Sequence, residues 1–264
     1  MGKVYILMRH DNSLDMDIPH DIEMAVAMYG FRELAAEIVP YHIVSEIYDR
    51  VTRDDIVVDY MSQCKTIFKK FGAEPNLPDY PTQLQKYLGR KIWKDTIDSI
   101  SRDESKWSAG NFVKPVTSKA FTGKIISSLK DLEGCGSYTG DAEVLVSEPI
   151  DIAAEWRCFI LYDKILDVRP YSMFVNPEKD AYRYGYDPKT LDAILEDFKT
   201  WAGRPAACAI DICQTKDGRT LLVELNDAYA LGSYGLFPIF YARMISARWS
   251  QLLGRPDEYD FRMV

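Results

Sequence analysis

The sequence is poor in the residues that most often carry covalent catalysis or zinc. Its 264 residues include three histidines and five cysteines. The cysteines are odd in number and form no C-x-x-C pair, and the histidines are scattered, so neither type shows metal-ligand spacing. No Ser/His or Cys/His constellation is apparent either, which leaves no candidate protein nucleophile. Free cysteines inside apolar segments favour a reducing compartment, and we expect a cytoplasmic protein.

Long apolar runs and an excess of positive charge are also missing. No apolar stretch approaches the length of a transmembrane helix, and the first one, 4–8, is too short for a signal-peptide core. Acidic residues outnumber basic ones by 40 to 32, which gives a net charge of −8. An acidic chain has no global electrostatic reason to bind nucleic acid or an anionic membrane, and we expect neither as a partner.

The order of predicted strands and helices, and a proline-rich segment, suggest a domain organisation. Strands and helices alternate before the proline-rich segment 73–81, which predicts a small α/β domain with a mostly parallel sheet over residues 1–80. The expected strands there are 4–8, 37–44 and 56–58, and the expected helices are 19–37 and 62–71. Beyond the linker we expect helices at 82–100, 188–201 and 236–253, strands at 112–115 and 144–146, and a strand pair at 156–162 and 165–168.

The most informative segment is 209–226. Alternating apolar residues flank Asp217-Gly218, and Asp-Gly in such a setting is a strong hairpin signal. A two-residue turn there places Asp211 directly opposite Glu224, and Asn226 points to the same face. Like charges opposite each other in a ladder are destabilising, and a divalent cation would resolve the repulsion. Oxygen ligands of this kind suit Mg2+ or Mn2+ rather than zinc.

Two other interpretations of this segment stay open on the pattern alone. A lone glutamate in a run such as 221–225 is typical of an edge strand that keeps its carboxylate in solvent. A three-residue loop would also break the facing register of Asp211 and Glu224.

The hairpin also carries a family resemblance. Asp211, Glu224 and Asn226, followed by a glycine-containing segment at 232–235, resemble the metal-binding hairpin of the ATP-grasp superfamily. The resemblance covers roughly residues 105–250 and is strongest to a branch named for two arginines and one lysine, found in phage and bacterial conflict or modification systems. It implies an α/β (α+β) ATP-grasp fold whose two lobes, 81–148 and 149–264, clasp ATP. It also implies Mg2+ on the three hairpin residues.

Lys114 is the expected phosphate-binding lysine. Pro115 forces the residue before it into extended geometry, so Lys114 is held on a strand. The resemblance implies contact with the α- and β-phosphates, whereas an isolated lysine is more often a solvated surface charge. Lys119 and Lys124 flank a segment with a single glycine, where the family often has a mobile glycine-rich loop. Each is either a second phosphate contact or a loop charge.

Two acidic residues are candidates for the nucleoside part of ATP. Glu148 lies in a segment similar to the hinge between the lobes, where the backbone contacts the adenine edge. Glu155 resembles the acid that binds ribose hydroxyls in several family members. For Glu148, a plain surface acid is the alternative.

Arg157 and Arg169 are expected to act together. A three-residue loop at 162–164 places them opposite each other, whereas a two-residue loop places them on opposite faces. Two facing guanidiniums favour an anion between them, and arginine suits bidentate phosphate contact. The alternative is an ordinary strand ion pair with Glu155 or Asp167. The resemblance favours phosphate, because these arginines match the pair that names the branch.

The segments expected to meet the acceptor substrate lie near the end of the chain. Arg183, in a tyrosine-rich stretch, is expected to face the acceptor. The loop 232–235 precedes a helix, and such loops bind anionic groups through backbone N–H groups at a helix N-terminus. A flexible connector is the alternative for this loop.

The resemblance implies an ATP-dependent carboxylate–amine ligase that works through an acylphosphate. Lys114, Arg157 and Arg169 would act on the phosphates, and the partners would be a small-molecule or peptide carboxylate and an amine. Two alternatives come from other classes: a kinase of the same fold that phosphorylates a hydroxyl, and a non-catalytic nucleotide-binding or interaction module. The latter predicts loss of a metal ligand, whereas Asp211, Glu224 and Asn226 are all present.

Overall fold

The computed structural model describes residues 2–116, 121–136, 140–171 and 184–260. Contacts within the chain divide it into two compact units. Unit 1 comprises Met1–Tyr87, Ala153–Gln214 and Gly218–Val264, and unit 2 comprises Leu88–Ile152 and Thr215–Asp217. Lys119 and Arg183 lie outside the described residues. None of the helices in the described part of the chain has the length and apolarity needed to cross a membrane.

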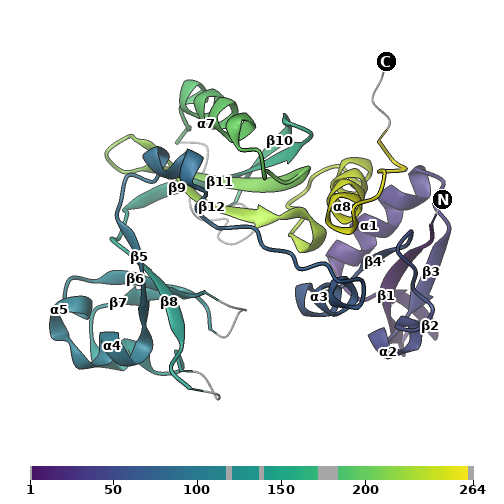
Figure 1. The fold of residues 1–264 in the computed structure, drawn as a ribbon, viewed down its shortest axis with the longest axis horizontal. Helices are drawn as coiled ribbons and strands as arrows, with labels where there is room; N and C mark the ends of the chain where they lie inside the picture. The colour runs from purple at the N-terminus through teal and green to yellow at the C-terminus, as the bar shows by residue number, and fades with distance from the viewer. Residues whose placement is uncertain (1, 117–120, 137–139, 172–183, 261–264) are drawn as a thin grey trace. The chain divides into compact units, whose positions relative to one another are not determined.

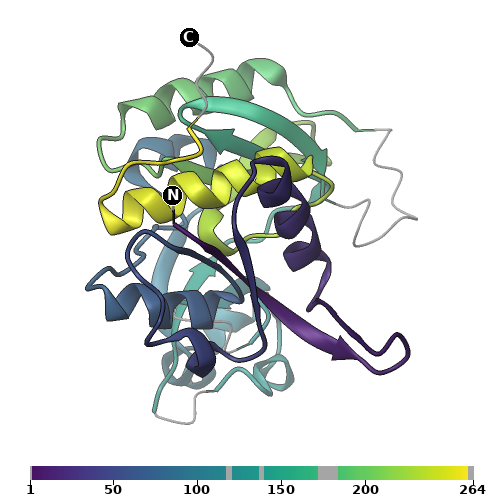
Figure 2. The same ribbon diagram turned by 90° about the vertical axis from the view of Figure 1, so that its right-hand side faces the viewer.

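The first sheet of unit 1 confirms the expected mostly parallel α/β arrangement. Its central strand β1 (Val4–Asp11) pairs in parallel with β3 (Ile38–Tyr41) and β4 (Ile56–Val58), and antiparallel with β2 (Met16–Pro19). Figure 2 shows β1 and β2 as a purple hairpin. The connecting helices are α1 (Ile22–Glu33), α2 (Val44–Ile47) and α3 (Met61–Lys70).

Helix α1 is shorter than the expected helix at 19–37. Pro19 belongs to strand β2, and Asp21 is the N-cap, since its side chain accepts hydrogen bonds from the backbone N–H groups of Glu23 and Met24. The helix ends at Glu33, and Ala35 has a positive φ of 57°. The cap therefore decides where this helix begins, which apolar spacing alone does not indicate.

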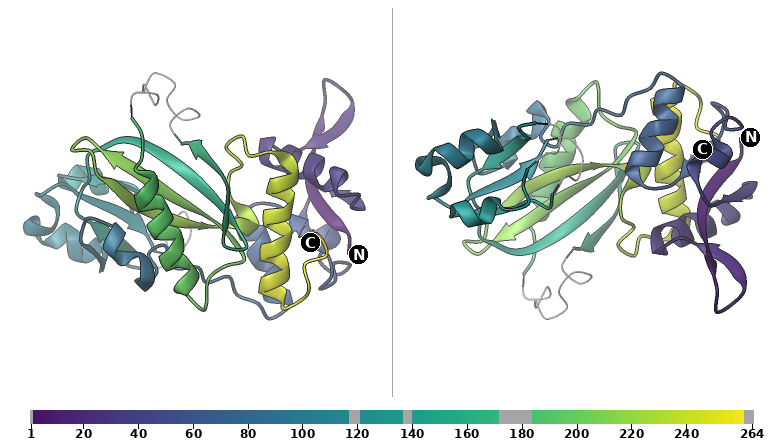
Figure 3. Two further views of the ribbon diagram at one scale, coloured as in Figure 1. Left: turned by 90° about the horizontal axis from the view of Figure 1, so that it is seen from above. Right: turned by 90° about the horizontal axis from the view of Figure 1, so that it is seen from below.

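The second sheet of unit 1 has the strand order β10-β9-β11-β12. Its strands are β9 (Ile152–Leu161), β10 (Lys164–Pro170), β11 (Ala207–Thr215) and β12 (Thr220–Asp227). Helix α7 (Pro188–Thr200) crosses one face of this sheet, as Figure 3 shows, and buries Leu191, Ile194 and Phe198. The short helix η4 (Ala228–Ala230) and the long helix α8 (Pro238–Leu253) follow β12.

One apolar core joins the two sheets of unit 1. It includes β1, β3 and β4, the buried faces of α1, α3 and α8, and residues of β9 and β11 such as Phe159 and Ala209. Burial of apolar surface is the main force that holds such elements together. The first sheet with its helices and the strands β9 and β11 of the second sheet are therefore parts of one packed body.

Helices α1 and α8 lie side by side in this core (Figure 1). Gly30 of α1 lies at a close approach to the backbone of α8. A Cβ atom added there would lie 2.0 Å from the carbonyl oxygen of Pro238 and 2.8 Å from the Cβ of Ala242. A backbone carbonyl cannot move aside as a flexible side chain does.

Gly30→Ala should therefore lower the free energy of unfolding. Alanine is the better helix former by about 1 kcal/mol, but overpacking of a helix contact typically costs about 1–3 kcal/mol, and here the overlap is with backbone. Chemical denaturation of the full chain measures the change. Gly185→Ala is the control, since a Cβ there meets nothing within 4 Å. Equal stability of the two variants would contradict the prediction.

Unit 2 is a separate antiparallel sheet with the strand order β5-β8-β6-β7. Its strands are β5 (Ile92–Thr96), β6 (Asn111–Pro115), β7 (Lys124–Ile126) and β8 (Glu143–Ser147). The short helices α4 (Ile97–Arg102), α5 (Glu104–Trp107) and η2 (Leu129–Leu132) complete it. Val113, Ile126, Val144 and Val146 are buried in its core.

The expected helix at 82–100 is wrong. A short 3-10 helix, η1 (Thr82–Tyr87), is followed by strand β5 and then by α4. Gly89 has a positive φ of 60°, which is incompatible with a continuous right-handed helix. Strand β5 follows it and pairs along its whole length with β8. Pairing with a distant strand overrides the helical spacing of Leu84, Leu88 and Ile92.

Candidate functional site

The predicted pairing of Asp211 with Glu224 is confirmed, but the predicted turn is wrong. Residues 216–219 connect β11 and β12, and next to this connection Gln214 pairs with Thr220 and Ile212 with Leu222. The register then shifts, because Val223 is an extra residue on β12. This β-bulge brings Glu224 opposite Asp211, and bulges of this kind often redirect side chains at functional sites.

In the hairpin of β9 and β10, a register shift likewise offsets a loop of unexpected length. The expected three-residue loop is wrong, since Lys164 pairs with Leu161 and only Tyr162 and Asp163 form the turn, with φ values of 47° and 65°. An irregularity between Ile165 and Asp167 adds one residue to β10. Arg157 consequently lies opposite Arg169, as expected, although the loop has two residues.

The strand order turns these two pairs into a row of charges across one sheet. Arg169 on β10, Arg157 on β9, Asp211 on β11 and Glu224 on β12 follow one another in the order β10-β9-β11-β12. We call these four side chains the charged row. Two positive charges are thus followed by two negative ones, and the oppositely charged members meet in the middle of the sheet.

Arg157 and Asp211 form a buried, bidentate ion pair. Arg157 Nε and Nη2 donate to the two carboxylate oxygens of Asp211 at 2.8 and 2.7 Å, and the side chains are 5% and 3% exposed. Burial alone would lower the pKa of Arg157, but the hydrogen bonds and the charge of Asp211 raise it above its usual value. The guanidinium also lies over the rings of Tyr171 and Tyr234, at 5.1 and 4.6 Å.

This partner was not foreseen from the sequence. The expected ion-pair alternatives for Arg157 were Glu155 and Asp167, and Asp211 lies 54 residues further along the chain. Only the adjacency of β9 and β11 brings the two residues together. The aromatic residues Tyr171 and Tyr234 were likewise missed, because no local pattern relates them to Arg157.

Asn226 lies beside both carboxylates of the row. Its Nδ2 donates to Asp211 Oδ2 at 2.8 Å and lies 3.5 Å from Glu224 Oε1. Asp211 is buried, whereas Glu224 and Asn226 are partly exposed. The amide therefore helps to balance the two like charges that face each other across the hairpin.

The donor set of this hairpin fits a hard divalent cation. Two carboxylates and an amide group lie close together, and Mg2+ takes oxygen ligands of these types. Within the described residues, no three His, Cys, Asp or Glu side chains form a metal-binding group. The amide of Asn226 is thus needed to complete a three-ligand set.

Arg169 differs from Arg157 in its exposure. Its Nε and Nη2 lie 2.7 and 2.6 Å from Asp167 Oδ2, and the two side chains are 40% and 31% exposed. This is the strand ion pair that stood as the alternative to a phosphate role. Such exposed pairs contribute little to stability. Within the charged row, Arg169 rather than Arg157 presents its guanidinium to solvent.

Unit 2 holds the expected lysines on different faces of its sheet. Lys114 of β6 lies opposite Leu145, whereas Lys124 of β7 lies opposite Val113. Neighbouring residues on a strand alternate between faces, so the two lysines point in opposite directions. Lys124 Nζ donates to the carbonyl oxygen of Glu133 at 3.1 Å. The structure therefore does not bring the two lysines together.

Gly123 lies next to Lys114. A Cβ atom at this position would be 3.0 Å from the Cβ of Lys114 and 2.6 Å from the ring of Phe112. The glycine thus permits a close approach that a larger residue would disturb.

The two expected nucleoside contacts have defined surroundings. Glu148 follows β8, and its Oε2 accepts a hydrogen bond from the backbone N–H of Lys91 at 2.9 Å. Glu155 precedes Arg157 by two residues on β9, and its carbonyl oxygen accepts from the N–H of Tyr171 at 2.8 Å. Glu155 and Arg157 therefore share a face of the sheet.

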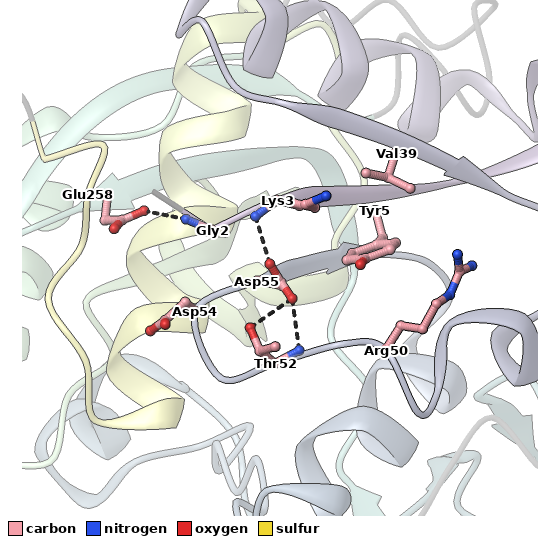
Figure 4. A pocket seen from close by; sticks show the side chains of 9 residues that line it. All are labelled: Gly2, Lys3, Tyr5, Val39, Arg50, Thr52, Asp54, Asp55 and Glu258. Atoms are coloured by element: carbon pink, nitrogen blue, oxygen red, sulfur yellow. Dashed lines mark hydrogen bonds between the residues drawn. The ribbon is translucent and has the colours of Figure 1, made fainter.

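A surface pocket of unit 1 contains no residue of the charged row (Figure 4). Its walls include Lys3, Asp54 and Asp55. Asp55 accepts hydrogen bonds from the backbone N–H groups of Lys3 and Thr52, so its carboxylate is occupied in holding the chain together. We assign no ligand to this pocket.

Comparison with solved structures places the fold among ATP-grasp proteins. A RimK domain ATP-grasp protein from Sphaerobacter thermophilus superimposes with a TM-score of 0.58 at 13% identity, covering 96% of this chain and 100% of that one. The macrocyclase MdnC from Microcystis aeruginosa, bound with precursor peptide MdnA, gives 0.52 at 14% identity, covering 93% and 99%. D-Alanine–D-alanine ligase from Bacillus anthracis gives 0.51 at 15% identity, covering 96% and 99%.

These likenesses confirm the predicted ATP-grasp fold, and at such identities they show the fold alone. A search of the curated proteins gave no match. A family model, in contrast, matches residues 87–244, which is more than half of the chain and includes both hairpins of the charged row. The chain belongs to this family of ATP-grasp domains, which is family 2 of the clade named for two arginines and one lysine.

Proposed function

We propose that this protein is an ATP-dependent ligase that joins a carboxylate to an amine through an acylphosphate. The observation that carries the proposal is the charged row beside Asn226, in which a hard-oxygen ligand set adjoins two arginines on one sheet. Membership of the ATP-grasp family supports nucleotide binding at this row. The choice of a carboxylate as acceptor rests on the resemblance to family ligases.

The residues of the charged row have distinct proposed roles. Asp211, Glu224 and Asn226 would hold Mg2+, which when bound neutralises phosphate charge. Arg157 fixes the carboxylate of Asp211 through its two hydrogen bonds. Arg169 is a phosphate contact, because its exposed guanidinium can exchange Asp167 for a more highly charged anion.

Other proposed contacts come from the resemblance. Lys114 would contact the α- and β-phosphates, Glu155 the ribose, and the segment at Glu148 the adenine. The proposed lobes are residues 81–148 and 149–264. The main segment of unit 2, Leu88–Ile152, overlaps most of the first proposed lobe, and this overlap supports the division into two lobes.

The proposed reaction has two steps. An oxygen of the substrate carboxylate attacks the γ-phosphorus of ATP, the bond to the β-phosphate oxygen breaks, and ADP leaves. The amine nitrogen then attacks the acyl carbon, the phosphate leaves with the C–O bonding electrons, and the nitrogen loses a proton. The residues of the protein supply position and charge neutralisation rather than a covalent link.

The cysteines agree with a mechanism that uses no protein nucleophile. All five cysteines of the chain are buried and free. Burial raises the pKa of Cys64, Cys158 and Cys208 well above that of an exposed thiol. Thiols of this kind are inert, since the thiolate is the nucleophilic form.

Hydroxylamine trapping tests the reaction. With ATP, Mg2+ and a mixture of carboxylic acids, we expect an acyl hydroxamate together with ADP, because hydroxylamine intercepts an acylphosphate. A colorimetric iron assay and mass spectrometry detect the product. The control is the Glu224→Gln variant under the same conditions, which should give none.

The kinase alternative has a different outcome in the same experiment. A phosphate ester on a hydroxyl oxygen is stable to hydroxylamine and keeps the transferred phosphate. If ATP consumption yields such an ester and no hydroxamate with any acid, the ligase proposal is wrong and the kinase takes its place.

A further inference from the structure

Glu23 is a partly buried acid that lies outside the matched family region. It stands in the first turn of α1, and its Oε2 accepts a hydrogen bond from the backbone N–H of Ser233 at 2.8 Å. The cap of α1 is already provided by Asp21. The carboxylate of Glu23 is therefore directed to the loop that follows the metal hairpin rather than to its own helix.

That loop has a backbone conformation that needs support. Ser233 is 4% exposed, and its carbonyl oxygen accepts from the N–H of Leu236 at 2.7 Å. Tyr234, a non-glycine residue, has a positive φ of 45°, and Gly235 follows with 81°. A left-handed tyrosine is uncommon and persists where surrounding contacts hold it. The hydrogen bond from Ser233 to Glu23 is such a contact.

The conformation of Tyr234 places its ring against the charged row. The ring stacks on Tyr171 with centroids 4.7 Å apart and a 25° angle between planes. The guanidinium of Arg157 lies 4.6 Å from the centroid of Tyr234. Arg157 in turn makes both of its short contacts with Asp211. A continuous series of contacts thus runs from α1 to the proposed metal ligands.

A purely structural role does not account for a carboxylate at position 23. Burial raises the pKa of Glu23, while hydrogen bonds from Ser233 and the charge of Arg157 oppose that shift. A raised pKa means that the folded state favours the protonated acid, so the ionised acid costs stability as pH rises through that pKa. Glutamine would accept the same hydrogen bond without this cost. Of the charged groups that act on Glu23, Asp21 raises its pKa further and Arg157 lowers it.

We propose that Glu23 is a positioning residue for the nucleotide site, holding the loop at Ser233 so that Tyr234 keeps Arg157 against Asp211. This inference rests on the proposed function, since it assigns Glu23 to the same site. MgATP affinity should then depend on Glu23, although the residue acts through its neighbours.

The test uses the full chain with Glu23→Ala, Glu23→Gln and the control Glu33→Ala, whose side chain is exposed on the same helix. Titration calorimetry gives the Kd of MgATP, hydrogen exchange reports on peptides covering 231–236, and thermal unfolding gives Tm. We expect Glu23→Ala to weaken MgATP binding by about 3- to 30-fold, the range of couplings transmitted through packed contacts, and to speed exchange at Ser233. Glu23→Gln should restore slow exchange and only part of the affinity. Glu33→Ala should change neither.

Two results would overturn the inference. If Glu23→Ala lowers Tm while the MgATP Kd of the folded protein is unchanged, Glu23 is merely structural. If exchange at 231–236 is unaffected in that variant, Glu23 does not hold the loop. A parent chain that fails to bind MgATP refutes the proposed function instead, and the exchange data then decide whether Glu23 fixes the loop.

Discussion

Glu224→Gln should leave the protein folded and reduce ATP turnover by at least about 100-fold, because Glu224 is a proposed direct ligand and loss of even an outer-shell partner costs about 10- to 100-fold. Glutamine has the shape of glutamate but lacks the anionic oxygen that a hard cation prefers. The structure strengthens this expectation, because Glu224 faces Asp211 across the hairpin and its neutralisation removes a like-charge pair. The stability of the variant should therefore match or exceed that of the parent.

Two measurements check this prediction. Titration with Mn2+ reports on the proposed metal site without any acceptor, and ADP release in a mixture of acids and amines reports on turnover. Glu196→Gln is the matched control, because Glu196 is an exposed acid of α7 outside the charged row. Parent-like Mn2+ affinity and turnover in Glu224→Gln would show that Glu224 is not a ligand of the proposed metal site.

Arg157→Ala should lower the free energy of unfolding by about 3–5 kcal/mol, the usual cost of leaving one partner of a buried ion pair without the other. Asp211 is almost fully buried and receives two hydrogen bonds from Arg157. A phosphate role alone, as the sequence suggested, predicts weaker ATP binding with little change in Tm. The structure instead predicts a large loss of stability, and denaturant unfolding measures it.

Arg169→Ala is the matched control for this prediction. Arg169 lies directly opposite Arg157, but its pair with Asp167 is exposed, so its loss should change stability by about 1 kcal/mol or less. The double variant Arg157→Ala with Asp211→Ala completes a mutant cycle, in which coupled partners lose less together than the sum of the single losses. Equal, small losses for both arginine variants would contradict a stabilising Arg157–Asp211 pair.

The sequence determined the local features of the site. Alternation of apolar residues and the Asp-Gly signal located the hairpin that carries Asp211 and Glu224, and both predicted cross-strand pairs are present. The loop lengths that were meant to produce these pairs were wrong in both hairpins. A single bulge in each case restores the facing register, and no turn motif in the sequence announces Val223 or Leu166 as the extra residue.

Tertiary structure alone decided which of these pieces meet. Because β9 lies beside β11 in the sheet, Arg157 meets Asp211. Helix α1 packs against α8, and Glu23 of α1 contacts Ser233, which is 210 residues away in the chain. Pairing with the distant strand β8 likewise made a strand of residues 92–96, where local spacing indicated a helix. Turns and periodicity act over a few residues, whereas distant contacts form only where burial of a shared apolar core outweighs the entropy of closing long loops.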